Sequence, residues 1–274
     1  MRGQLGSALA IAGVVGMVVL ARPATVSAAT IVFSASGSDA ASIQTTVDNY
    51  RAVFGDNNLN VAGSQDSGRR EINWDGGGAA ALATTFPNPQ TTFSNRGNVN
   101  TSPGGAVEQS GAPMPEFGEI NPTYPDIFQT FSSPRLFAPI GSNITDVFFT
   151  VPGTTDVPAM SRGFGAVFTD VDLANTTSLQ FFDPFGASLG TFFVPTANNG
   201  LSFLGLQFED AFIGRVRITT GNAALGPNDG GGVDVVAMDD FIYAEPQAVP
   251  EPSTLLLLGL GASAAFGARR RRAL

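Results

Sequence analysis

Short apolar runs separated by turn residues fill the second half of the chain and limit what it can fold into. Within residues 213–219, Val216 and Ile218 alternate with Arg215 and Arg217, which is the period-2 pattern of a half-buried strand. Runs of this kind recur every 8–14 residues or so, with turns between them. The runs lie at 144–151, 163–171, 178–182, 188–194, 201–208, 213–219 and 233–243. The pattern predicts an all-β fold, an antiparallel β-sandwich or jelly roll.

One segment near the start has a different period. Ile43, Val47, Tyr50 and Phe54 recur at spacings of four, three and four, which places them on one face of a helix. Ser38 or Asp39 can cap its start and Gly55 its end. The spacing predicts one N-terminal helix over residues 38–54.

The first 29 residues have the pattern of a signal peptide. Arg2 gives a positive start, residues 5–20 are apolar and uncharged, and Val26 to Ala28 offer small residues to a signal peptidase. We expect a signal-peptide helix and cleavage near Ala28 or Ala29. A permanent membrane anchor is the alternative interpretation.

The last 26 residues, 249–274, combine three features in a fixed order. The first is Val249, Pro250, Glu251 and Pro252, in which the two prolines favour an extended and accessible backbone. An apolar stretch, 254–268, follows; as a helix rising 1.5 Å per residue it spans about 22 Å, short of the roughly 30 Å hydrocarbon core of a bilayer. The chain then carries a basic cluster of Arg269, Arg270, Arg271 and Arg272. We expect a short hydrophobic helix that inserts transiently in the inner membrane, with the arginines in the cytoplasm. An ordinary tail anchor is the alternative.

This order of Pro-Glu-Pro, apolar stretch and terminal arginines resembles the PEP-CTERM sorting signal, which occurs in Gram-negative bacteria, often those that make exopolysaccharide. The resemblance implies recognition by a membrane-embedded exosortase, removal of the tail, and delivery to the cell surface or the extracellular matrix. With the signal peptide it predicts export through the inner membrane, with exosortase and signal peptidase as processing partners.

Between these ends the sequence divides into two parts. Residues 30–140 hold the predicted helix and long loops rich in Gly, Asn, Ser and Thr, and residues 141–246 hold the regular β pattern. The second part, with motifs such as Gly163-Phe164-Gly165 and Asp170-Val171-Asp172, resembles the β-sandwich cores of uncharacterised PEP-CTERM proteins. Its closing residues 239–243 also resemble the last strand of jelly-roll carbohydrate-binding modules.

Composition excludes several chemistries. The chain has no cysteine and no histidine, so disulfides, Cys/His zinc sites and nucleophilic triads that use His or Cys are ruled out. Between residues 30 and 248 there are 22 acidic and 8 basic residues, a net charge of −14. Such a domain repels phosphate backbones, so we expect no nucleic-acid partner. Oxygen-only metal sites remain available, above all for calcium.

Two pairs of aspartates are the candidate calcium ligands. Asp170 and Asp172 are separated by one residue at the end of a strand, so alternation points both carboxylates to one side. Asp239 and Asp240 lie in the last strand and are candidates to join them. The alternative is that all four are solvated or cap turns. Residues 228–234 (NDGGGVD) resemble a calcium loop superficially, and we interpret them as a flexible hairpin loop.

Two further features have open interpretations. Trp74, the only tryptophan, and Asp75 are candidates for a sugar-binding platform, while core packing is the favoured role of the indole. Carboxylates at Glu71, Glu116, Glu119 and Glu209 are candidates for a glycoside-hydrolysing pair, whose separation the sequence does not show.

Three functions follow as hypotheses. We expect a non-catalytic surface or matrix protein associated with exopolysaccharide, with no certain cofactor beyond candidate calcium. The alternatives are a carboxylate-dependent glycan-processing enzyme and a purely structural surface protein.

Overall fold

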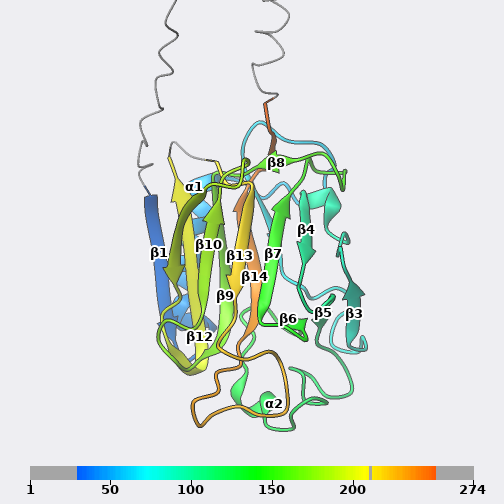
Figure 1. The fold of residues 1–274 in the computed structure, drawn as a ribbon, viewed down its shortest axis with the longest axis vertical. Coiled ribbons are helices and arrows are strands. Elements are labelled where there is room, and N and C mark those ends of the chain that lie inside the picture. Colours follow the sequence, from blue (N-terminus) through cyan, green and yellow to red (C-terminus); the bar gives the residue numbers. More distant parts are fainter. Residues whose placement is uncertain (1–29, 210–211, 251–274) are drawn as a thin grey trace, which may run out of the picture.

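The protein is an antiparallel β-sandwich with one main helix (Figure 1). A computed structural model of the chain describes residues 30–209 and 212–250. The predicted signal-peptide helix and C-terminal hydrophobic helix lie outside the described residues. The larger sheet contains β1 (Thr30–Gly37), β2 (Arg69–Ile72), β3 (Thr84–Pro87), β5 (Ala106–Gln109), β6 (Phe137–Ile140), β9 (Gly163–Val171), β12 (Ala197–Phe208) and β14 (Ala237–Ala244). The smaller sheet contains β4 (Asn98–Thr101), β7 (Ile144–Phe149), β10 (Ser178–Phe182), β11 (Ser188–Phe193) and β13 (Arg215–Thr219).

The strand order shows which parts of the sequence contribute to each sheet. The larger sheet runs β1-β12-β9-β14-β6-β5-β3, with β2 also paired to β14, and the smaller runs β11-β10-β13-β7-β4. A two-stranded sheet joins β8 (Ala159–Met160) to β15 (Gln247–Ala248). Strands β1, β2 and β4 pair with β12, β14 and β7. The loop-rich part and the regular part of the sequence therefore share both sheets.

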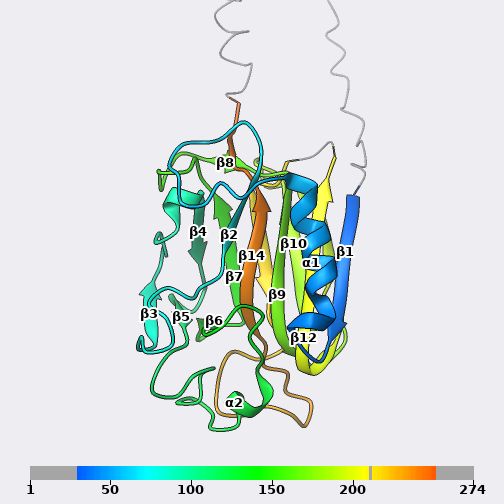
Figure 2. The same ribbon diagram turned by 180° about the vertical axis from the view of Figure 1, so that it is seen from behind.

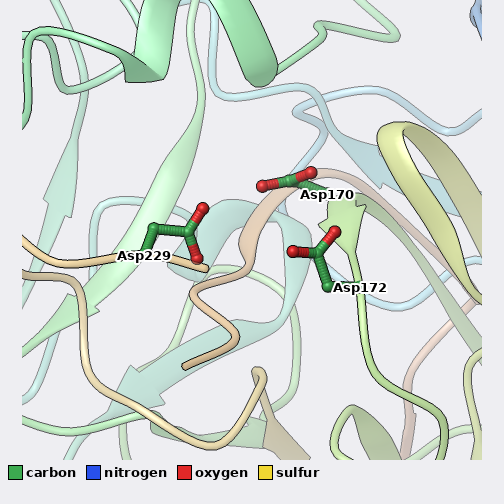
Figure 3. A group of neighbouring side chains, drawn as sticks. All are labelled: Asp170, Asp172 and Asp229. Atoms are coloured by element: carbon green, nitrogen blue, oxygen red, sulfur yellow. The ribbon is translucent and has the colours of Figure 1, made fainter. Parts of the chain in front are cut away.

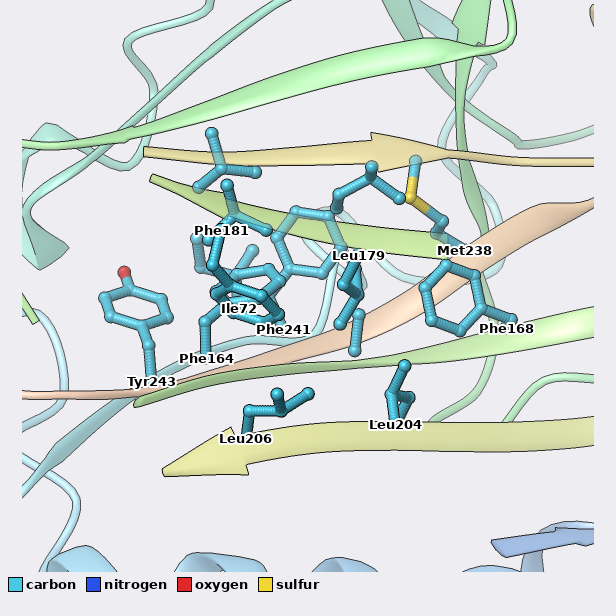
Figure 4. Close-up of a cluster of buried hydrophobic side chains, with 14 of the residues drawn as sticks. Ile72, Phe164, Phe168, Leu179, Phe181, Leu204, Leu206, Met238, Phe241 and Tyr243 are labelled. Atoms are coloured by element: carbon cyan, nitrogen blue, oxygen red, sulfur yellow. The ribbon is translucent and has the colours of Figure 1, made fainter. Parts of the chain in front are cut away.

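The main core lies between the two sheets (Figure 4). Phe164 and Phe241 meet edge to face at 5.3 Å between ring centroids, and Phe181 packs against Phe208 at the same distance. Inward residues of β9, β10 and β14 supply most of these rings because every second residue of a strand faces the other sheet. Phenylalanine at alternating positions is thus the physical basis of the sandwich.

Helix α1 (Ala40–Phe54) covers the outer face of the larger sheet beside β1, β12 and β9 (Figure 2). Asp39 caps it by accepting a hydrogen bond from the Ser42 N–H at 2.9 Å. Its buried face includes Tyr50, whose ring lies over Gly165 and Gly205. A Cβ at Gly165 would meet that ring at 2.9 Å and the Gly205 backbone at 2.8 Å. The helix confirms the prediction from spacing.

Trp74 belongs to the core. Its side chain is only 1% exposed and stacks on Phe137, with ring centroids 3.7 Å apart and an interplanar angle of 12°. Phe93 and Phe241 contact it edge to face. The indole therefore offers no open face to a sugar, and the hypothesis of a Trp74 ligand platform is corrected in favour of core packing.

The sandwich has two poles with different contents. The chain enters at Thr30 and leaves through β15 at the same pole, which we call the terminal pole (Figure 1). The opposite pole, which we call the distal pole, is covered by α2 (Tyr124–Ile127) and the loop of residues 220–236. Among residues 30–209 and 212–250, no helix is long and apolar enough to cross a membrane.

Candidate metal site

Three carboxylates meet at the distal pole (Figure 3). Asp170 and Asp172 stand at the end of β9, and Asp229 comes from the loop before β14. Each offers one oxygen within 4.8 Å of the others. Asp170 has a positive φ of 63°, a conformation that Asp tolerates better than most residues, and this turns the strand end toward the loop. We call these three side chains the carboxylate group.

A fourth aspartate, Asp234, holds the backbone next to this group in place. Asp234 is fully buried and accepts hydrogen bonds from the N–H groups of Asp172 and Leu173 at 3.1 and 3.4 Å. The Thr176 hydroxyl also donates to it. Because both Asp234 oxygens accept hydrogen bonds from the protein, this residue fixes the turn after β9 and is not itself available to a ligand.

The carboxylate group is electrostatically unfavourable without a cation. Burial, followed by the charges of Asp172, Asp229 and Asp234, raises the pKa of Asp170 to about 7, although a hydrogen bond from the Asn199 N–H opposes this. Burial and the charges of Asp229 and Asp234 also raise the pKa of Asp172. Within the described ranges, no arginine forms an ion pair with these three carboxyls. Like charges therefore face one another with no protein cation between them.

Several oxygens of the group are available for coordination. Asp170 uses one oxygen to accept from the Asn199 N–H at 2.7 Å, and Asp229 uses one to accept from the Val235 N–H at 3.1 Å. Asp172 Oδ1 is buried without a hydrogen-bond partner. Calcium takes six to eight oxygen ligands from carboxylates, carbonyls and water, so the donor set fits this ion in kind. A soft or nitrogen-preferring metal has no suitable ligand here.

Asp239 and Asp240 lie in a separate network, away from the carboxylate group. Asp239 is fully buried and accepts from the N–H groups of Phe131 and Ser132 at 2.6 and 3.3 Å. Asp240 accepts from the Ser132 hydroxyl at 2.6 Å and pairs with Arg51 at 3.1 Å. Their role is to tie the 128–133 loop to β14, and the structure does not bring them to Asp170 and Asp172.

This second network borders a cavity of about 350 Å³ that Arg51, Glu71, Arg96 and Asp240 help to line. Burial raises the pKa of Asp240 to about 6, against opposing hydrogen bonds and the charge of Arg51. Burial, with the charge of Asp240, raises the pKa of Asp239 well above its ordinary value. Arg51 also pairs with Glu71 at 2.9 Å, so a cation already bridges the two acids that line the cavity.

The other candidate residues have structural contacts. Asp75 accepts from the Arg135 N–H at 3.1 Å and from the Asn73 side-chain amide at 2.9 Å, which holds the turn after Trp74. Burial raises the pKa values of Glu116 and Glu119, which lie on the loop before α2. Glu71 is held by two arginines.

Asp229 and Asp234 escaped the sequence-based prediction. Both lie in the 228–234 segment, which we interpreted as a flexible hairpin loop because it lacks the terminal glutamate of an EF-hand. The segment is anchored: the Asp234 N–H donates to the Asn222 side chain at 2.9 Å, and Gly230 and Val233 form a β-bridge. The two aspartates that flank the glycine run, Asp229 and Asp234, were the available signal.

The first residue of the predicted sorting motif, Val249, is still hydrogen-bonded to the sandwich. Strand β15 pairs with β8, and the Val249 N–H donates to the Pro158 carbonyl at 3.3 Å. Pro250 is the last described residue. Glu251, Pro252 and Arg269, Arg270, Arg271 and Arg272 lie outside the described residues.

Fold and site together define an acidic all-β domain with a carboxylate group at one pole and its chain ends at the other. The chain's own identity comes from its C-terminus. Residues 248–272 match the PEP-CTERM protein-sorting motif, and this motif implies an exported protein that an exosortase sorts to the surface or extracellular space. No curated protein and no solved structure matches it.

Proposed function

We propose that the exported domain is a non-catalytic surface or matrix protein that binds calcium at the carboxylate group and, through the metal, acidic exopolysaccharide. The observation that carries the proposal is the meeting of Asp170, Asp172 and Asp229 within 4.8 Å without a protein cation. A divalent cation would remove the repulsion among these carboxylates and use the oxygens left without partners.

Metal bridging suits this domain better than aromatic stacking. Trp74, Tyr50, Tyr124 and Tyr243 are all buried, so no tryptophan or tyrosine among the described residues presents a ring to a sugar. Direct attraction to an acidic polysaccharide is also disfavoured, because the domain carries a net charge of −14. A calcium ion coordinated by the domain and by carboxylates of the polymer needs no aromatic platform. It also offsets the repulsion between the acidic domain and the acidic polymer.

The pole that holds the group lies opposite the exit of the sorting tail. Asp170, Asp172 and Asp229 lie at the distal pole, while the sorting tail leaves from the terminal pole (Figure 1). A domain held at a cell surface by its tail would therefore present the carboxylate group outward.

The test is binding of the domain to a uronic-acid polysaccharide such as alginate, and to the host's own matrix polymer, in calcium and in chelator. We expect binding in calcium alone, and loss of it in Asp170→Asn combined with Asp229→Asn. Asp156→Asn, an exposed acid at the terminal pole, is the matched control and keeps binding. Equal retention in calcium and in chelator contradicts metal bridging, and no binding in either favours a purely structural surface protein.

A second candidate function is carboxylate-dependent glycan processing. The observation in its favour is Asp240, whose pKa is raised to about 6 and which lines a 350 Å³ cavity with Glu71. The Arg51 bridge between the two acids argues against it, because a paired carboxylate is a weaker acid or base catalyst. Release of reducing sugar that disappears in Asp240→Asn would establish this function in place of the first.

A further inference from the structure

The terminal pole carries several exposed apolar side chains. Leu59 is 63% exposed, Val61 54%, Val157 44% and Phe185 78%. They come from three separate loops: the one after α1, the one before β8, and the β10–β11 turn. Figures 1 and 2 show these loops at the pole where β1 begins and β15 ends. We call these four residues the apolar rim.

We propose that, before its tail is removed, the domain rests this apolar rim on the outer leaflet of the inner membrane. The occupant of the surface is the lipid bilayer itself. The inference depends on insertion of the apolar stretch at residues 254–268 in that membrane, which belongs to the sorting function, and it is independent of calcium binding.

Chain length keeps the terminal pole close to the membrane. The apolar stretch begins at Thr254, and Pro250 is the last described residue. Four residue steps reach at most about 14 Å even when fully extended. Strand β12, with 12 residues, measures about 40 Å at 3.3 Å per residue, so the distal pole cannot turn to the membrane on so short a tether.

The part of the rim that carries Leu59 and Val61 is held in place by a buried ion pair. Arg70 is fully buried and pairs with Glu245 at the end of β14. Its guanidinium also donates to the carbonyl groups of Leu59 and Val61 at 3.0 and 2.7 Å. Because these carbonyls are fixed toward Arg70, the loop is anchored by its backbone while both side chains stay exposed.

An apolar cleft lies beside the exit of the tail. A cavity of about 400 Å³ is lined by Met160, Pro184, Phe185, Phe212, Val249 and Pro250. The first residues of the sorting motif therefore form part of the same apolar surface as Phe185. Contact with hydrocarbon at this pole would bury the rim and the exit of the tail together.

The contact is expected to be apolar in character. Acidic residues such as Asp56, Asp66 and Asp156 also lie on the loops of this pole, so attraction to anionic lipid does not drive it. Zwitterionic vesicles are therefore the suitable probe, and added salt should not abolish the contact.

The test exploits the absence of cysteine from the chain. Single Phe185→Cys and Phe193→Cys variants of the full chain are spin-labelled and incorporated in phosphatidylcholine vesicles. The control is matched, since Phe193 is also a phenylalanine of the β10–β11 hairpin and is 51% exposed, but lies at the far end of β11. Vesicle flotation reports anchoring, and collision with oxygen or with a water-soluble nickel complex reports the surroundings of each label.

We expect the label at position 185 to collide more with oxygen than with nickel, and the label at position 193 to show the reverse. Equal access of nickel to both labels in chains that float with the vesicles would overturn the proposal. A chain that does not float would remove the membrane insertion on which it rests and would overturn it as well. Neither result affects calcium binding, which is measured separately.

Discussion

The carboxyl groups of Asp170 and Asp229 face each other across the distal pole within 4.8 Å, although one stands on β9 and the other on the loop before β14 (Figure 3). Folding therefore brings like charges together that the unfolded chain keeps apart. Such an arrangement lowers stability unless a proton or a cation occupies it.

Asp229→Asn should raise the stability of the metal-free protein. Removal of one charge relieves its repulsion with Asp170 and Asp172, and the amide oxygen can still accept the Val235 N–H. We expect a gain of about 1 kcal/mol, the size of the Coulomb repulsion between two unit charges about 4 Å apart in water. Urea unfolding in chelator measures it, with Asp156→Asn as the control that stays within about 0.5 kcal/mol of wild type. A loss of stability would show that Asp229 is not repelled in the native state.

The Asp239–Asp240 pair predicts a pH dependence. The pKa of Asp240 is raised to about 6 in the folded state, above its ordinary value of 3.8. The folded state thus binds a proton that the unfolded state has released between about pH 4 and pH 6, so this contribution to stability is fully present below the lower value and lost as pH rises. The melting temperature in chelator should fall less between pH 4.5 and 6.5 in Asp240→Asn than in wild type. Identical slopes would contradict the raised pKa.

Arg70→Met should destabilise the protein strongly. It leaves Glu245 as a buried unpaired carboxylate and removes the donors to the Leu59 and Val61 carbonyls. Loss of one partner of a buried pair costs about 3–5 kcal/mol. The control is Arg217→Met, since Arg217 pairs with Asp146 but is 38% exposed, and it should cost about 1 kcal/mol or less. Equal effects in chemical unfolding would mean that burial of Arg70 is unimportant.

Trp74 gives a direct optical test of the core. Its fluorescence should be blue-shifted in the native state and should shift to the red on unfolding, because the indole is buried against Phe137. Polysaccharide should leave the emission unchanged, since the ring meets no ligand. Trp74→Ala should cost about 3–5 kcal/mol, whereas Phe185→Ala, at an exposed site, should be nearly silent. Quenching of Trp74 by bound sugar would restore the ligand hypothesis.

Periodicity was sufficient for most of the fold. The 3.6-residue spacing of Ile43, Val47 and Tyr50 located α1, and Gly163–Val171 is a strand with the predicted bounds. These predictions succeeded because burial of one face imposes the pattern directly on the sequence. Strands β2 to β6 were harder to predict from the sequence, because each has only four residues and they alternate with long loops.

Only two of the three residues of the carboxylate group could be predicted from the sequence to lie together. Asp170 and Asp172 share a strand end, so alternation alone brings them together. Asp229 approaches them through the tertiary path of the 220–236 loop, which no local pattern encodes. From the sequence, Asp239 and Asp240 are equally plausible ligands. In the folded protein, however, Asp239 accepts a hydrogen bond from the 128–133 loop and Asp240 pairs with Arg51.

Calorimetric titration of calcium into the chelator-treated domain tests the central claim most directly. The account predicts saturable binding of one ion by wild type, accompanied by a rise in melting temperature, and loss of both in Asp170→Asn combined with Asp229→Asn, while Asp239→Asn still binds. Absence of binding heat together with an unchanged melting temperature in wild type would contradict it, and the aspartates at the distal pole would then serve only to shape its turns.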